Sequence, residues 1–187
     1  MLFNGVRNAA IALKHAPGGK EREGAMSVSL RESVQLISDP HGLDSSVEEV
    51  FRLMLGLACH RDSGTEAIRL GESVTAVVGF GGMLSGACVF RSDSQTAASI
   101  AAHMTGMEFA EVDDTVKDAV GEICNMLAGA WKGRVPELSA NCGLSVPAVI
   151  TGHDYNLRVQ SPEFQLRHVY RFGESTFAVT IVCDGLQ

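Results

Sequence analysis

The sequence predicts a two-layer α+β domain in which a mostly antiparallel sheet, built with hairpins, packs against long helices. Two pairs of Val- and Phe-rich segments are each joined by two residues that include glycine, which is the pattern of a β-hairpin. Hairpins imply antiparallel pairing, and the expected order of helix, hairpin, helix, helix and strands differs from that of a doubly wound parallel sheet. The first hairpin is expected over Ser73–Phe80 and Met83–Phe90 across Gly81-Gly82, and the second over Phe164–Phe172 and Ser175–Cys183 across Gly173-Glu174.

The first helix is expected to begin within Asp44–Glu49. Ser45 or Ser46 can cap it, because each has a glutamate three residues later. Apolar residues then recur at helical spacing and predict one buried face. These residues are Val47, Val50, Phe51, Met54 and Ala58.

Two further helices and a strand follow the first hairpin. The segment Ser92–Ser94 is expected to cap a helix over roughly Gln95–Thr105. The next helix is expected over Asp114–Trp131, with an acidic pair at its start. After Pro136 the pattern turns to strands again, and the first of them is expected over Leu144–Thr151.

The length of 187 residues suits one domain with an extension. A composition that is 45% hydrophobic and 20% charged can support a sizeable core. The N-terminal part differs, because a turn-rich and charged stretch, Pro17–Gly24, follows a short apolar segment. We therefore expect residues 1–25 to be a disordered extension and residues 26–187 to form a single domain.

The charge and the reactive residues exclude several classes of function. A net charge of −7 argues against nucleic acid or an anionic membrane as the main partner. A run of about 18 apolar residues, which a membrane span would need, does not occur. The five cysteines form no Cys-x-x-Cys pair and suit reduced core thiols in a cytoplasmic protein. The histidines lack metal-ligand spacing, so we expect no metal site.

The helix Asp114–Trp131 carries the main functional hypothesis. Winding it at about 100° per residue places one apolar stripe toward the core and a polar line on the opposite side. Small residues at the border of the polar line are expected to let another protein's backbone approach. The apolar stripe is Val116, Ala119, Val120, Ile123, Leu127 and Ala130; the polar line is Asp118, Glu122, Asn125 and Gly129; the border residues are Gly121 and Ala128.

The polar line is unusual for a helix selected for stability alone. Asn125 is a poor residue for a helix interior, because its amide competes for backbone hydrogen bonds. Gly121 and Gly129 each cost roughly 1 kcal/mol relative to alanine in such positions. A glutamate and an asparagine three residues apart are nevertheless common on an ordinary solvated face, so the helix alone does not decide its function.

The segment Asp118–Gly129 resembles the signature helix of the CheC/CheX/FliY family of chemotaxis phosphatases. The family pattern is Asp or Ser, three residues, Glu, two residues, Asn, and a proline a little over twenty residues later. Asp118, Glu122 and Asn125 have this spacing, and Pro147 follows about one residue nearer than the pattern. A single Glu-x-x-Asn helix is similar to the CheX branch, and the resemblance extends roughly from residue 43 to residue 184.

The resemblance implies a partner and a role for each site residue. The substrate would be the aspartyl phosphate of a CheY-like receiver domain, which brings its own Mg²⁺, so the chain would need no cofactor. Asn125 would orient the attacking water, and Glu122 would pair with a receiver lysine. Asp118, Gly121 and Gly129 would contribute to docking. The chain would be a monomer, or a homodimer that pairs through an edge strand of the late hairpin.

Two other functions remain open at the level of sequence. Similar domains occur in flagellar switch components, so the chain can also be a receiver-binding adaptor or an interaction module without catalysis. Asn125 favours catalysis, because an adaptor has no need of an amide there. The other alternative is an unrelated domain that binds a small ligand, which a deep pocket away from Glu122 and Asn125 would support.

Overall fold

The computed structural model describes residues 37, 39–63, 72–153, 155, 157 and 162–186. These residues all belong to one compact unit, Ser33–Gln187. The extension expected over residues 1–25 lies outside the described residues, so the predicted division of the chain stays a prediction.

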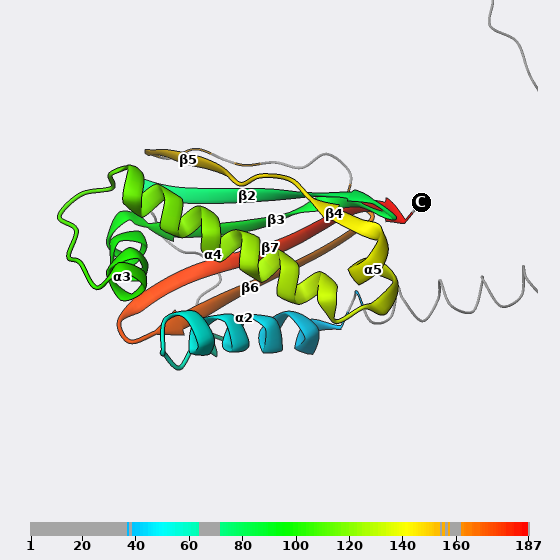
Figure 1. Ribbon diagram of the computed structural model, residues 1–187, viewed down its shortest axis with the longest axis horizontal. Coiled ribbons are helices and arrows are strands. Elements are labelled where there is room, and N and C mark those ends of the chain that lie inside the picture. The colour runs from blue at the N-terminus through cyan, green and yellow to red at the C-terminus, as the bar shows by residue number, and fades with distance from the viewer. Residues whose placement is uncertain are drawn as a thin grey trace, which may run out of the picture. The chain divides into compact units, whose positions relative to one another are not determined.

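In the described part of the chain, the strands form one seven-stranded sheet with antiparallel pairing throughout. Its order is β1-β6-β7-β3-β2-β4, and β5 also pairs with β2. Figure 1 shows β4 and β5 along one edge of the sheet and β6 toward the other. The strands are β1 (His60–Arg61), β2 (Glu72–Gly82), β3 (Leu84–Asp93), β4 (Cys142–Leu144), β5 (Ala148–His153), β6 (Phe164–Phe172) and β7 (Ser175–Leu186).

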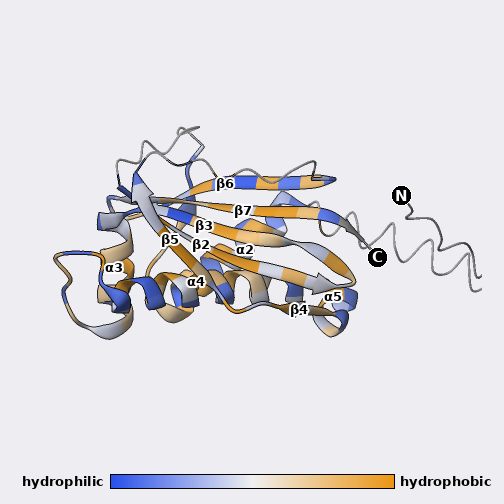
Figure 2. Cartoon of the chain, turned by 90° about the horizontal axis from the view of Figure 1, so that it is seen from above, coloured by the Kyte–Doolittle hydropathy of each residue, from blue (hydrophilic) through white to orange (hydrophobic). Residues whose placement is uncertain are grey.

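The helices form the second layer, and α4 lies lengthwise across the sheet (Figure 1). Hydrophobic residues run along the central strands β7 and β3, as Figure 2 shows in orange. The predicted two-layer α+β arrangement is therefore confirmed. The helices are α2 (Pro40–Met54), α3 (Ser94–Thr105), α4 (Asp114–Gly133) and α5 (Pro136–Asn141).

Both predicted hairpins are present, as β2–β3 and β6–β7. In the second, Phe172 lies opposite Ser175, and Gly173 takes the positive φ of +51° that this short turn requires. The predicted helix starts are also confirmed for α3 and α4. The Asp93 carboxylate accepts from the Thr96 N–H at 2.6 Å, and the Asp113 carboxylate accepts from the Val116 N–H at 2.9 Å.

The start of α2 lies six or seven residues before the predicted one, since the cap is Asp39 and not Ser45 or Ser46. The helix begins at Pro40, because the Asp39 carboxylate accepts from the His41 N–H at 3.0 Å and proline suits the first turn. Ser46 is a buried residue inside the helix, and its hydroxyl donates to the Gly42 carbonyl at 2.7 Å. The helix ends at Met54, which is exposed. The buried face consists of Leu43, Ser46, Val47, Val50 and Phe51, without Met54 or Ala58.

Three other elements differ from the prediction. The short helix α5 follows Pro136 where a strand was expected, because proline starts a helix as readily as it interrupts one. The strand expected over Leu144–Thr151 is divided between β4 and β5. The strand β1 has two residues, which is too short for its alternation to be recognised in the sequence.

The core lies between the helices and the sheet. Phe177 of β7 is at its centre, with its ring 4.6 Å from that of Phe51 and 5.0 Å from that of Phe90. Trp131 is buried, as predicted, with its ring 5.3 Å from that of Phe80. The predicted apolar stripe of α4 is buried except for Ala130, which is partly covered.

The five cysteines are buried free thiols, which confirms their expected role in the core. Cys124 of α4 packs against the sheet, with its sulfur 3.5 Å from the carbonyl oxygens of Ala76 and Cys88. Burial raises the pKa of Cys59 and of Cys183 to about 12. These thiols therefore stay protonated near neutral pH and are poor nucleophiles.

A buried polar cluster ties α2 to β6, and Asp44 is its only carboxylate among the described residues. The Tyr170 hydroxyl donates to Asp44 at 2.8 Å, and His168 Nδ1 lies 2.8 Å from the same oxygen. We expect Asp44→Ala to lower the free energy of unfolding by about 1–3 kcal/mol, because two buried groups lose their partner. Urea denaturation measures this. The exposed Glu48→Ala on the same helix should change stability by less than about 0.5 kcal/mol, and an equal loss in both variants would contradict the prediction.

Candidate functional site

The polar line of α4 lies where the helical periodicity predicts it. Asp118 and Glu122 are exposed, and Asn125 is half-buried. Within the described part of the chain, no hydrogen bond or ion pair engages these three side chains. Polar groups that the fold itself does not use are available to a partner, and Glu122 and Asn125 lie about one helical turn apart on the same face.

The edge of the sheet forms a wall beside this helix face. A Cβ atom at Gly121 would lie 3.3 Å from Pro147 Cβ and 3.4 Å from Val149 Cγ2. A Cβ atom at Gly129 would lie 4.0 Å from Leu144 Cδ1. Residues 121, 125 and 129 follow one another at intervals of four and form one ridge of the helix. Asn125 is therefore flanked on its own ridge by two glycines over which the β4–β5 edge passes.

The expectation that Gly121 and Ala128 admit a partner's backbone is wrong in this structure, because both residues are buried. The chain's own Pro147 and Val149 occupy the space beside Gly121. The missing side chain thus serves close packing of the edge strand on the helix. Gly129 is partly exposed, so its contribution to docking stays a prediction.

The edge strand contains a β-bulge at this point. β4 ends with Leu144 opposite Phe80, and β5 begins with Ala148 opposite Val77. Three residues of the edge strand, Ser145–Pro147, therefore lie opposite two residues of β2. One extra residue on one side of an antiparallel pair is the definition of a bulge, and bulges occur often at sheet edges and beside active sites.

Hydrogen bonds hold the bulge in place. The Ser145 N–H donates to the Gly79 carbonyl at 2.9 Å, and the Gly79 N–H donates to Ser145 Oγ at 2.8 Å. The Ser145 hydroxyl in turn donates to the Val146 carbonyl at 2.9 Å. Pro147 has no N–H to satisfy, which suits an interrupted part of the ladder. The bulge is therefore a defined element of the edge strand.

The bulge changes which residues face α4. Side chains alternate along a regular strand, so Leu144 and Val146 would both face the helix, and Val146 would lie over the ridge near Asn125. The extra residue instead brings Pro147 and Val149 against the helix. Val146 is turned outward and is 85% exposed. Asn125 is only half-buried, which agrees with an outward-turned Val146 that does not cover it.

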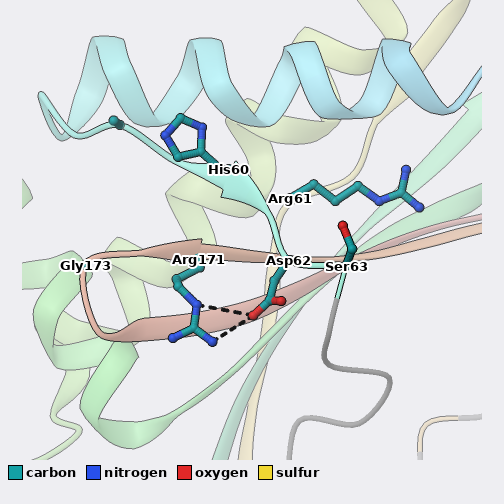
Figure 3. Close-up of a pocket in the computed structure, with 7 residues that line it drawn as sticks. His60, Arg61, Asp62, Ser63, Arg171 and Gly173 are labelled. Atoms are coloured by element: carbon teal, nitrogen blue, oxygen red, sulfur yellow. Dashed lines mark hydrogen bonds and ion pairs between the residues drawn. The ribbon is translucent and has the colours of Figure 1, made fainter.

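A recess of about 290 Å³ lies away from this face, where β1 meets the β6–β7 turn (Figure 3). Its charged groups are paired: Arg171 donates to Asp62 at 2.8 and 3.2 Å, and Arg61 lies 3.5 Å from Asp44. It is open to solvent, and polar atoms make up as much of its lining as apolar atoms, unlike the mostly apolar clefts that enclose small ligands. It is therefore a weaker candidate than the α4 face. The recess is lined by Ala58, His60, Arg61, Asp62, Ser63, Arg171 and Gly173.

The described residues contain neither of two further classes of site. No group of three or more His, Cys, Asp or Glu side chains there is arranged to hold a metal ion. None of the helices in the same ranges is long and apolar enough to span a membrane.

In sequence, this chain is similar to CheX proteins. The family model described as "Chemotaxis phosphatase CheX" matches residues 74–168, just over half of the chain. A CheY-P phosphatase CheX of Thermotoga maritima is 29% identical over 121 residues, which cover 63% of this chain and 78% of that relative.

Solved structures share the fold. The chemotaxis protein CheX from Vibrio vulnificus has a TM-score of 0.63 at 21% identity, covering 77% of this chain and 94% of its own. A chain of the CheX–CheY–BeF₃–Mg²⁺ complex from Borrelia burgdorferi has a TM-score of 0.61 at 22% identity, covering 78% of this chain and 97% of its own. These similarities confirm the expected CheC-like fold.

Proposed function

Because the chain belongs to the CheX family of chemotaxis phosphatases, we propose that it hydrolyses the aspartyl phosphate of a CheY-like response regulator. The observation that carries the proposal is the pair Glu122 and Asn125, which lies on the accessible face of α4 without partners among the described residues. The Thermotoga maritima relative is named a CheY-P phosphatase, and the Borrelia burgdorferi structure contains CheY, which supports a receiver as the partner.

Asn125 acts on the attacking water. Hydrolysis of a phosphoryl group depends mainly on positioning and on stabilising charge, so a strong general base is not required. An amide both donates and accepts hydrogen bonds and can therefore orient one water molecule toward phosphorus. Asn125 is half-buried, and the β4–β5 edge passes over the glycines on either side of it along the ridge. When the receiver is bound, its Mg²⁺ supplies the charge that offsets the phosphoryl oxygens.

Glu122 positions the receiver. Its carboxylate is exposed and lies about one turn from Asn125, where it can pair with a lysine beside the phosphorylated aspartate. Asp118 lies a further turn along the same face and adds negative charge. Gly129, at the other end of the line, leaves room for the receiver surface. These contacts place the phosphoryl group over the Asn125 amide.

The direct test measures the phosphate lifetime of a phosphorylated receiver with and without this chain. We expect substoichiometric amounts of the chain to shorten the lifetime, because a catalyst turns over. Stoichiometric binding without a shorter lifetime would identify a receiver-binding adaptor and overturn the proposal. The receivers encoded in the same genome are the natural substrates to survey.

We expect Glu122→Lys to raise the KM for the phosphorylated receiver about 10- to 100-fold, because the variant places like charge against the receiver lysine. At saturating receiver, kcat should stay close to that of the wild type, since Asn125 is intact. Steady-state phosphate release measures both constants. Glu48→Lys on α2 makes the same charge change at an exposed position and should leave KM unaltered. An unchanged KM for Glu122→Lys would contradict the docking role.

A further inference from the structure

We propose that Val146 is a specificity-determining residue that inserts into an apolar recess on the receiver beside its phosphorylated aspartate. This inference rests on the proposed function, because it assigns the second contact of the same site. The first contact is electrostatic, through Glu122. The bulge supplies the second, which is apolar and lies in the edge strand beside the α4 ridge of Gly121, Asn125 and Gly129.

The exposure of Val146 is the first support for this assignment. Val146 is 85% exposed, whereas the next most exposed large hydrophobic residue among the described ones, Leu53, is 60% exposed. Scattered apolar residues on a surface are ordinary. Val146, however, would face α4 in a regular strand, and the extra residue of the bulge directs it outward.

The rigidity of the surrounding segment is the second support. The Ser145 hydrogen bonds to Gly79 fix the backbone on one side of Val146, and Pro147 packs on Gly121 on the other. Valine is branched at Cβ and has few rotamers. An apolar group held this way loses little conformational entropy on binding, which is the property of a preorganised contact residue.

The position of Val146 indicates which partner contacts it. It follows Ser145 and precedes Pro147, and Pro147 touches Gly121, the residue before Glu122. A body that reaches Asn125 must therefore lie between the α4 carboxylates and the bulge. We infer a receiver face that carries both a basic group and an apolar recess beside its phosphorylation site.

A second copy of this chain fits the surface around Val146 less well than a receiver does. Two edges join by continuing the hydrogen-bond ladder of a strand. The bulge interrupts that ladder over Ser145–Pro147, and Pro147 has no N–H to offer.

The test compares Val146→Asp with Val146→Ile in the full-length chain. Because Val146 is exposed, both variants should unfold at the wild-type temperature. We expect Val146→Asp to raise the KM for the phosphorylated receiver about tenfold with kcat unchanged, the effect of losing one apolar contact. Val146→Ile should keep the wild-type KM, because isoleucine is also an apolar side chain branched at Cβ. Leu53→Asp, on α2 at the opposite edge in Figure 1, is the matched control and should have no effect.

The outcomes separate this inference from the proposed function. If the wild-type chain fails to shorten the phosphate lifetime, the proposed function fails first. If the wild type is active and Val146→Asp keeps the wild-type KM, only the role of Val146 is overturned. A change in sedimentation of Val146→Asp from dimer to monomer, with KM unchanged, would assign the residue to self-association and overturn the inference as well.

Discussion

Replacing Asn125 with alanine will abolish acceleration of receiver dephosphorylation while leaving the fold and receiver affinity intact. Within the polar line Asp118, Glu122, Asn125 and Gly129, the amide is the only side-chain group that both donates and accepts, so no neighbour in this line can replace it. Removing one preorganised hydrogen-bonding group from a catalytic site costs about 10²- to 10³-fold in rate. The decrease should appear in kcat, measured as phosphate release at saturating receiver.

Stability and affinity provide the controls for Asn125→Ala. Alanine favours a helix interior more than asparagine does by up to about 0.7 kcal/mol, so the melting temperature should be equal or slightly higher. Asn141→Ala makes the same change at an exposed position of α5 and should keep full activity. A variant that clears phosphate at the native rate would refute the mechanism. A variant that no longer binds the receiver would assign Asn125 to docking.

The helix half of the site was predictable because its determinants are local. A period of 3.6 residues separates the buried stripe from Asp118, Glu122 and Asn125, and this spacing needs no knowledge of the rest of the fold. The capping aspartates Asp93 and Asp113 act on N–H groups three residues later, so they are equally visible in the sequence. The two hairpins depend on short turns and were recognisable for the same reason.

The strand half of the site was not predictable, because the bulge is set by pairing between distant segments. Gly79 and Ser145 are 66 residues apart in sequence. The extra residue of the edge strand becomes visible only when its pairing with β2 is known. The segment therefore resembled one continuous strand. The neighbours of Gly121 are likewise determined by a distant segment. A glycine on the border of a polar helix face gives the same pattern whether the neighbour is another protein or the chain's own Pro147.

The close contact at Gly121 leads to the second large expected effect, that of Gly121→Leu. A Cβ atom there already meets Pro147 at 3.3 Å and Val149 at 3.4 Å, so the remaining atoms of leucine must push the edge strand away from α4. Overpacking of this kind costs about 1–3 kcal/mol. Displacement of the wall by about 1 Å should lower kcat/KM roughly 100-fold, because it moves both the surroundings of Asn125 and the Val146 contact.

The pattern of kinetic constants distinguishes this effect from loss of the amide. Gly121→Leu should lower kcat and raise KM together, whereas Asn125→Ala should lower kcat alone. Gly133→Leu, at the exposed end of the same helix with no atom within 4 Å of its Cβ position, should remain fully active. Gly121→Ala should be nearly neutral in stability, since about 1 kcal/mol of helix propensity opposes the 3.3 Å contact. Full activity in Gly121→Leu would mean that the site consists of the helix alone and that the bulged edge strand has no part in it.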